Sequence, residues 1–220
     1  MHPDRPACRE PLKSDSFGRI LHLEEDGRGF IRRELGAAPW WARPLARWLA
    51  AREARALRGL DGIPSTPRLL RWDGRCLDRT YLDGAAMYQR PPHGDAAYFR
   101  AARHLLGQLH RRGIAHNDLA KEANWLVLAD GAPGLIDFQL AVRGNPRSPW
   151  LRLLAREDLR HLLKHKRTYC PQRLTPVERR VLQRPSWVRA LWFATGKPVY
   201  RFVTRRVLHW RDNEGRGPRP

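Results

Sequence analysis

The chain has 220 residues, of which 42% are hydrophobic, so it is long and apolar enough for one domain with a buried core. No apolar run approaches the roughly 20 residues that a transmembrane helix needs, and the N-terminus lacks the basic-then-apolar pattern of a secretion signal. The formal net charge is +20. The three cysteines (Cys8, Cys76 and Cys170) are too scattered for a disulfide framework, which favours a cytoplasmic protein.

The first part of the chain is predicted to contain strands and one helix. Residues 16–34 predict two short strands joined by an Asp-Gly turn, and residues 68–82 predict a second pair of the same kind. Between them, residues 39–60 carry apolar side chains near helical spacing, which indicates a helix. We therefore expect residues 14–84 to form a small, strand-rich unit.

The following part is predicted to be mainly helical. Residues 95–112 carry one apolar stripe that indicates a helix, and Gly113 is well placed to end it. Two short apolar runs, residues 125–128 and 135–138, predict a β-hairpin. The remaining residues are basic, rich in Trp and helical in pattern, so the expected fold class is α+β.

Three polar residues around this hairpin indicate a catalytic site: Asp118, Asn124 and Asp137. The hairpin should bring Asn124, just before its first strand, close to Asp137, at the end of its second strand. A carboxylate and an amide oxygen that meet in this way suit Mg²⁺, which prefers oxygen ligands. Asp118, one loop earlier, could orient an attacking hydroxyl and accept its proton. Phosphoryl transfer requires these components.

This segment resembles the catalytic loop and metal-binding strand of protein-kinase-like enzymes, whose motif is H-x-D-L-x-x-x-x-N followed by D-F-G. The chain has HNDL at residues 116–119, Asn124, and DFQ at residues 137–139. The resemblance covers residues 113–142 and is closest to the bacterial lipopolysaccharide-kinase (Kdo kinase) and RIO-like serine/threonine-kinase branch. It implies a two-lobed protein-kinase-like fold around an ATP-binding cleft, with a β-rich N-lobe and a shortened helical C-lobe at residues 85–210.

The resemblance also implies a role for each residue of the motif. Asp118 would be the catalytic base, and Asn124 and Asp137 would be the magnesium ligands. His116 would hold the loop against the strand before Asp137, and Lys121 could contact the transferred phosphate. Any one of these residues alone would indicate only a buried histidine or a turn cap; their order and spacing together favour the catalytic interpretation.

Three departures from the motif bear on activity and regulation. Asp118 and Asn124 are six residues apart, where the common motif has five, so the loop contains one extra residue. Gln139 replaces the glycine of D-F-G, so the flip that this glycine permits in regulated kinases is not expected. No activation-loop segment is recognisable after it.

In the same family a strand lysine pairs with a helix glutamate and holds the phosphates of the nucleotide. The helix candidate is Glu53, which lies on an apolar stripe without a basic partner on its own helix. The preceding strand offers Arg32 or Arg33 in place of lysine; we favour Arg33 and leave Arg32 open. The glycine-rich loop is reduced to Gly18, and residues 80–84 occur where adenine would contact the backbone.

Most of the positive charge lies in the second half of the chain. Residues 143–220 contain 20 Lys and Arg against 5 Asp and Glu, a net charge of +15, which leaves +5 for the first 142 residues. Within this half, residues 197–210 form a basic segment with an apolar helical stripe. Such a segment suits an anionic membrane surface or an ordinary helix whose apolar stripe packs on the C-lobe. A solvated arginine surface is another interpretation, a nucleic-acid partner is less favoured, and residues 211–220 are expected to form a flexible tail.

The sequence therefore predicts an ATP- and Mg²⁺-dependent kinase. Its acceptor would be a hydroxyl of a protein Ser or Thr, or of a membrane-linked sugar such as lipopolysaccharide core. Because the phosphate-binding lobe is reduced, an inactive pseudokinase that docks an anionic partner is the alternative. A small-molecule kinase of the aminoglycoside or choline type is a third hypothesis, but only about 80 residues follow Asp137 to enclose an acceptor.

Overall fold

The computed structural model describes residues 7–15, 17–25 and 27–183. Within these residues the chain is α+β, with four α-helices and three antiparallel sheets. The largest sheet has five strands in the order β1-β2-β3-β5-β4. They are β1 (Ala7–Asp15), β2 (Gly18–Glu25), β3 (Arg28–Glu34), β4 (Leu69–Trp72) and β5 (Cys76–Thr80).

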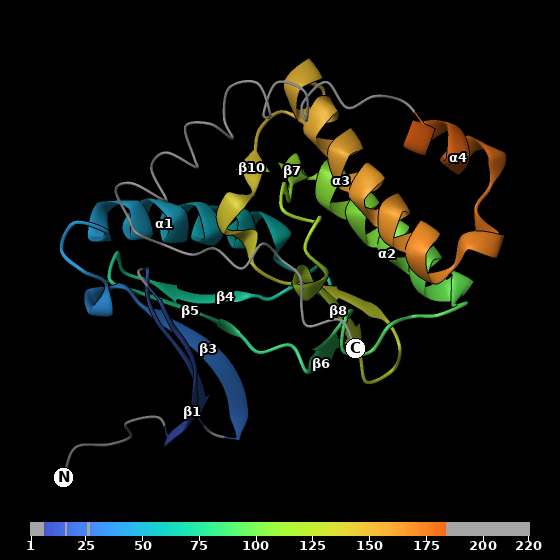
Figure 1. The fold of residues 1–220 in the computed structure, drawn as a ribbon. Helices are drawn as coiled ribbons and strands as arrows, with labels where there is room; N and C mark the ends of the chain where they lie inside the picture. Colours follow the sequence, from blue (N-terminus) through green and yellow to red (C-terminus); the bar gives the residue numbers. More distant parts are fainter. Residues whose placement is uncertain (1–6, 16, 26, 184–220) are drawn as a thin grey trace, which may run out of the picture.

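Helix α1 (Arg43–Leu60) lies between β3 and β4 in the sequence and packs on one face of this sheet (Figure 1). A short 3₁₀ turn, η1 (Leu35–Ala37), connects it to β3. Its sheet-facing side carries alanines at positions 46, 50 and 54, which are buried with Leu77 of β5. Alanine has the highest helix propensity, and its small apolar side chain lets the helix lie close to the strands.

The remaining elements form a second group, which Figure 1 shows on the side away from β1–β3. Helices α2, α3 and α4 belong to it, and β6, β8 and β9 form a small sheet between α2 and the five-stranded sheet. The short strands β7 and β10 pair with each other. The bounds are β6 (Gly84–Ala86), α2 (Ala96–Arg111), β7 (Ile114–Ala115), β8 (Trp125–Leu128), β9 (Pro133–Leu135), β10 (Val142–Arg143), α3 (Pro149–Tyr169) and α4 (Pro176–Gln183).

The caps of α2 follow from its sequence. The side chain of Asp95 accepts a hydrogen bond from the backbone N–H of Tyr98 at 2.9 Å, which satisfies one free donor of the first turn. Gly113 follows the helix with φ 72°, and a β-carbon there would clash with the carbonyl oxygen of Gly144. Only glycine suits this position, so the helix ends where the sequence indicated.

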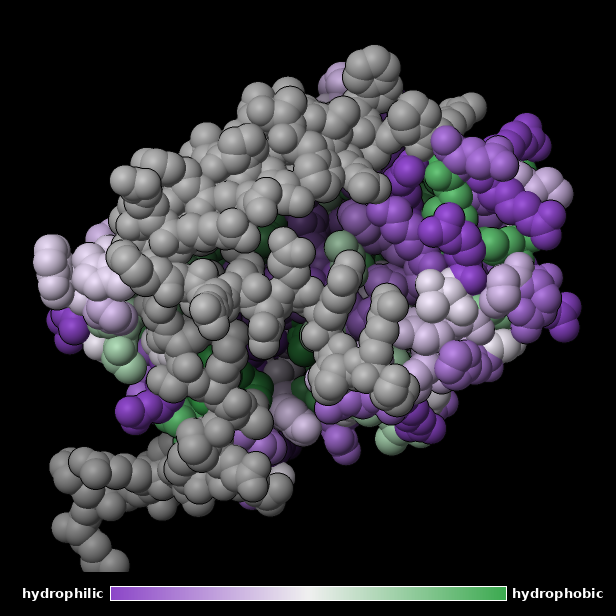
Figure 2. Space-filling view, in the orientation of Figure 1, coloured by the Kyte–Doolittle hydropathy of each residue, from purple (hydrophilic) through white to green (hydrophobic). Residues whose placement is uncertain are grey.

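One hydrophobic core joins the two groups of elements. Leu57 and Leu60 from the end of α1 are buried together with Leu105 and Leu109 of α2 and with Trp125 of β8. Because the two groups share this core, the loops between them are held in fixed relative positions. The surface over α3 and α4 that Figure 2 shows is largely hydrophilic.

Most of the expected elements are present, with three differences. The helix expected from residue 39 begins at Arg43, because residues 40–42 form turns. Strands β1, β6, β7 and β10 were not predicted. The second strand of the hairpin was expected to run to Phe138 but ends at Leu135. The reason is that Asp137 has left-handed backbone angles (φ 66°, ψ 67°), which a strand cannot contain. Phe138 then starts a 3₁₀ turn, η3 (Phe138–Leu140).

The basic segment at residues 197–210 and the tail at residues 211–220 lie outside the described residues. The predicted C-lobe boundary at residue 210 therefore lies outside them as well. Among the helices that are described, none is long and apolar enough to cross a membrane.

Candidate functional site

Asp158 of α3 holds the loop that carries Asp118. Its side chain is buried, and its carboxylate accepts hydrogen bonds from the backbone N–H groups of His116 at 2.8 Å and Asn117 at 2.9 Å. His110 Nε2 lies 3.1 Å from the same carboxylate. These contacts hold Asn117 in the left-handed region, at φ 62°, which few non-glycine residues adopt and which often occurs at functional sites.

Asp158 was not predicted from the sequence, although the residue pattern of α3 contains a signal for it. It lies four residues after Leu154 and four before Leu162, both of which are buried, so a carboxylate occurs on the apolar stripe of α3. A carboxylate in that position needs hydrogen-bond partners from other elements. The same argument singled out Glu53.

Two buried histidines connect this loop to neighbouring segments. His116 Nε2 lies 3.0 Å from the carbonyl oxygen of Ile136, so the loop is held against the segment before Asp137, which is the position indicated for His116 by the sequence. His165 Nε2 lies 2.9 Å from the carbonyl oxygen of Leu119. Burial lowers the pKa of His165, so its neutral ring donates this hydrogen bond.

Asp118, Lys121 and Asn124 lie together at the surface of the site. Lys121 Nζ donates to Asp118 Oδ2 at 2.8 Å. Asn124 Nδ2 donates to the backbone oxygen of Asp118 at 2.8 Å and to its Oδ2 at 3.1 Å. Asn124 is buried, whereas the side chain of Asp118 keeps 12% of its surface exposed and that of Lys121 49%. Asp118 is thus oriented from two sides and remains accessible.

Asp137 has the free oxygen that a metal ion would need. Its Oδ1 is buried and has no hydrogen-bond partner among the described residues, while its Oδ2 accepts from Gln139 Nε2 at 3.3 Å. Asn124 lies beside it, because the N–H of Ile136 donates to the backbone oxygen of Asn124 at 3.1 Å. A buried carboxylate oxygen without a partner is costly, and a cation would compensate it.

These residues fit Mg²⁺ better than a metal held only by protein. In the described part of the chain no three His, Cys, Asp or Glu side chains form a group that could hold a metal ion. Mg²⁺ is usually bound by one or two carboxylates together with phosphate oxygens and waters. The Asp137 carboxylate with the Asn124 amide matches that pattern.

Glu53 of α1 is paired with two arginines of the sheet. Its carboxylate is fully buried and lies 3.6 Å from Arg33 Nη1 and 3.4 Å from Arg79 Nε, at ion-pairing distance but outside hydrogen-bond geometry. Arg32 points to the other face of β3 and binds Asp78 through two hydrogen bonds of 2.8 Å. Adjacent strand residues alternate between faces, so only one of the neighbouring arginines can reach Glu53. Arg79 was not anticipated.

Gln139 connects this ion pair to Asp137. Its Oε1 accepts a hydrogen bond from Arg33 Nη1 at 3.0 Å, and its Nε2 donates to Asp137. A continuous chain of polar contacts therefore runs from Glu53 through Arg33 and Gln139 to Asp137. The elements it joins are α1, β3 and η3, so the geometry of the carboxylate depends on the position of the helix.

A small hollow adjoins the site on its apolar side. Its volume is about 150 Å³, and its walls come from Ile20 and Ile31 of the sheet, Leu126 and Ile136 of the hairpin region, and residues 79–82 and 84. The last segment includes most of the residues expected to contact adenine. Within the described chain, the N–H of Leu82, a residue that lines the hollow, donates no hydrogen bond to the backbone, so it is available to a planar ligand there.

Gly18 lies at the start of β2, directly after the turn that follows β1. Its φ is 123°, and a β-carbon there would clash with the carbonyl oxygen of Glu34. The glycine is therefore required by the close approach of two backbones, and this requirement is sufficient to explain it without a phosphate.

The structure thus joins Asp118, Lys121 and Asn124 by hydrogen bonds, and the backbone bond between Ile136 and Asn124 places Asp137 next to this group. Arg33 and Glu53 are linked to Asp137 through Gln139. Of the residues indicated by the sequence, Arg32 faces away from Glu53. Comparisons with protein-family models and with curated proteins give no match to this chain.

Proposed function

We propose that this chain is a kinase of the protein-kinase-like fold, which uses ATP and Mg²⁺ to phosphorylate a hydroxyl group. The observation that carries the proposal is the chain of contacts from Glu53 through Arg33 and Gln139 to Asp137. In protein kinases a basic residue on the third strand pairs with a glutamate of the following helix, and an aspartate after the catalytic loop holds the metal. We assign these roles to Arg33 on β3, Glu53 on α1 and Asp137 after the loop.

Each group has a task that its position supports. Asp118, oriented by Lys121 and Asn124 and still accessible, accepts the proton of the attacking hydroxyl. Asp137 and Asn124 would hold Mg²⁺, which neutralises charge on the phosphates when bound. Arginine binds phosphate oxygens bidentately, so Arg33 can replace the usual lysine.

The apolar hollow is the adenine site in this proposal. Its aliphatic walls would pack on both faces of the base, and the free N–H of Leu82 would bind its edge. The five-stranded sheet with α1 then corresponds to the N-lobe, and the group formed by α2–α4 corresponds to the C-lobe. The hollow and Asp118 occur between them.

The acceptor we propose is a hydroxyl of a protein Ser or Thr, or of a membrane-linked sugar. The basic second half of the chain would favour an anionic partner or a peripheral contact with an anionic membrane from the cytoplasmic side. ATP and Mg²⁺ are available in that compartment.

A second candidate is a pseudokinase-type binding module, and Gln139 is the observation that favours it. In the described structure this side chain bonds both Arg33 and Asp137, so the groups that would hold phosphate and metal are both engaged by Gln139. A protein that keeps the fold and has lost turnover would be stabilised by such contacts.

The test is magnesium-dependent ATP binding and turnover by the purified protein. We expect Asp118→Asn to retain ATP binding and to lose turnover by roughly 100-fold or more, since it removes a general base. Asp137→Asn should lose the magnesium dependence of binding. Asp61→Asn, an exposed aspartate outside the site, is the matched control.

Three results separate the candidates. Turnover that depends on Asp118 and Asp137 supports the kinase. ATP binding without turnover, unchanged by Asp118→Asn, supports the pseudokinase. Absence of both turnover and magnesium-dependent ATP binding in the wild-type chain contradicts the kinase and leaves the pseudokinase-type binding module.

A further inference from the structure

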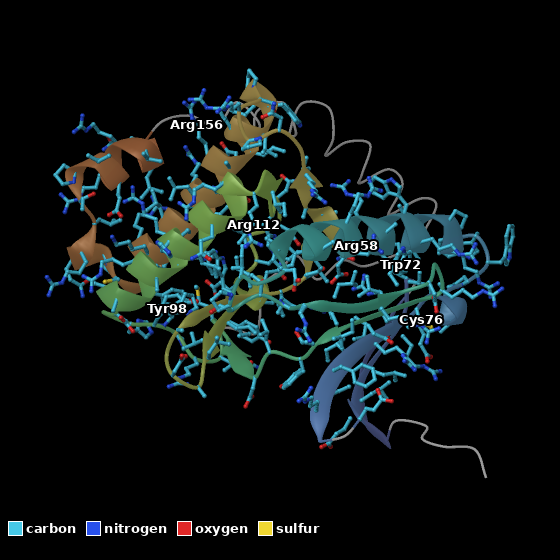
Figure 3. The ribbon with its side chains drawn as sticks, turned by 180° about the vertical axis from the view of Figure 1, so that it is seen from behind. Arg58, Trp72, Cys76, Tyr98, Arg112 and Arg156 are labelled. Carbon is cyan, nitrogen blue, oxygen red and sulfur yellow. The ribbon has the colours of Figure 1, made fainter. Side chains whose placement is uncertain are left out.

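A second concave site lies between α2 and α3, away from the proposed ATP site. It has a volume of about 310 Å³ and is called here the α2–α3 groove. Arg103 and His110 of α2 line one side, and Arg152 and Arg156 of α3 line the other. Figure 3 labels Arg156 on α3, on the side of the molecule opposite the five-stranded sheet. The volume lies at the lower end of the range of small-molecule sites.

The charge of the groove is unbalanced. Arg103, Arg152 and Arg156 are exposed, and none of them forms an ion pair with a described residue. None of the lining residues is acidic. Three positive charges around one concavity repel each other, and an anion between them would remove that repulsion.

These arginines differ from those of the proposed ATP site, which all have protein partners. Arg32 binds Asp78, and Arg33 and Arg79 lie against Glu53. The guanidinium groups of the groove therefore remain available for an external anion. Their planar, forked donors suit the oxygens of a phosphate better than a single carboxylate.

The floor of the groove is apolar and partly fixed. Leu106 and Leu159 form it, and Gly107 adds no side chain to it; a β-carbon there would lie 3.4 Å from Arg111 Nη1. His110 is held in place by its contact with Asp158, 3.1 Å away. A bare phosphate would leave this floor uncovered, whereas an ester with a compact apolar body would cover it.

We propose that the α2–α3 groove binds a phosphate ester whose phosphate lies among the three arginines and whose apolar body packs on Leu106 and Leu159. The ester could be soluble, or it could be the headgroup of a phospholipid; the two share this chemistry. The proposal is independent of the kinase function, because it uses neither Asp118 nor Asp137.

The first test uses phenyl phosphate as the probe, with binding measured by calorimetry on the full chain. We expect the wild type to bind phenyl phosphate at least threefold more tightly than inorganic phosphate, because of the apolar floor. The double variant Arg103→Ala/Arg156→Ala should bind at least tenfold more weakly. Arg100→Ala/Arg167→Ala removes the same charge from exposed positions of the same two helices outside the groove, and should bind like the wild type.

A third variant keeps the charge and fills the space. Gly107→Leu places a side chain in the groove, so it should also weaken phenyl phosphate binding at least tenfold. A helical glycine replaced by leucine does not destabilise a helix, and thermal melting checks that the variant is folded. If the two double arginine variants lost phenyl phosphate affinity equally, or if Gly107→Leu bound phenyl phosphate like the wild type, binding would reflect general charge attraction and the proposal would be overturned. Absence of phenyl phosphate binding by the wild type would also overturn it.

Vesicles distinguish the two sources of the phosphate. If the ligand is a lipid headgroup, the wild type should bind phosphatidylcholine vesicles that contain a fifth of phosphatidic acid. The Arg103→Ala/Arg156→Ala variant should then lose vesicle binding, and phenyl phosphate should compete with the vesicles. Phenyl phosphate binding with no vesicle binding that depends on these arginines assigns the groove to a soluble ester. Vesicle binding that both arginine pairs weaken equally, without phenyl phosphate binding, overturns the proposal.

Discussion

Arg33 donates a hydrogen bond of 3.0 Å to Gln139, a residue 106 positions further along the chain. Gln139 occupies the position where the motif that this segment resembles has glycine, and it also donates to Asp137. A side chain thus connects the ion pair of the sheet and α1 with the carboxylate beside the loop. The departure from the motif is therefore a structural link between the two halves of the site.

This link predicts that Gln139→Ala weakens magnesium-dependent ATP binding. Hydrogen bonds to charged groups contribute about 1.5–3 kcal/mol, so we expect an increase in Kd of roughly tenfold or more. The measurement is calorimetric titration of ATP with and without Mg²⁺, and the increase should be larger with Mg²⁺ because Asp137 loses its orientation. Gln172→Ala, at an exposed glutamine far along the chain, is the control. An unchanged Kd would show that Gln139 does not position Asp137 for the metal.

Glu53→Gln is expected to destabilise the fold. The substitution removes the charge that compensates Arg33 and Arg79, both of which keep only 11–12% of their side-chain surface exposed. Breaking a buried ion pair costs about 3–5 kcal/mol, so the free energy of unfolding in urea should fall by about 3 kcal/mol. Glu25→Gln, at an exposed glutamate, should change it by less than about 0.5 kcal/mol. A loss no greater than that of the control would mean that the ion pair adds nothing to stability.

Asp158→Ala is expected to release the loop that carries Asp118. It removes the acceptor for two backbone N–H groups and for His110. Each buried donor left without a partner costs about 1–3 kcal/mol, so the free energy of unfolding should fall by about 3 kcal/mol. Hydrogen exchange at the amides of His116 and Asn117 should accelerate more than at α2. If their protection persists in a folded variant, Asp158 is not what orders the loop.

The stability of the fold is expected to fall between pH 7 and pH 5. Burial lowers the pKa of His161 from 6.5 to about 4 and also lowers that of His165. In this window the unfolded chain binds protons that the folded chain does not, so stability decreases as the pH falls. For His161 alone the decrease is up to about 2 kcal/mol by pH 5.

Urea titrations at pH 7 and pH 5 measure this effect. His161→Gln should reduce the difference between the two pH values, whereas His104→Gln, at an exposed histidine, should leave it unchanged. The pH dependence would have another origin if both variants behaved like the wild type.

Local patterns of the sequence were sufficient for most of the elements. The apolar stripes indicated α1 and α2, Asp-Gly turns indicated the strand pairs, and Gly113 marked the end of α2, because caps, turns and stripes depend on residues only a few positions apart. The order of His116, Asp118, Asn124 and Asp137 likewise indicated the site, since a hairpin brings its own ends together. The end of the second hairpin strand was placed wrongly, because the left-handed backbone of Asp137 cannot be read from residue type.

The sequence by itself therefore determined the α+β fold class, most of the elements and the segment that carries the candidate site residues. The tertiary structure alone decided that Arg33, and not Arg32, reaches Glu53 and that Arg79 also lies against Glu53. It also decided that Gln139 bonds Arg33 and that Asp158 bonds the loop at His116. The physical reason is the distance along the chain. These contacts join residues 20 to 106 positions apart on different elements, and the face on which each side chain lies depends on strand register and helix rotation, which only the packed core determines.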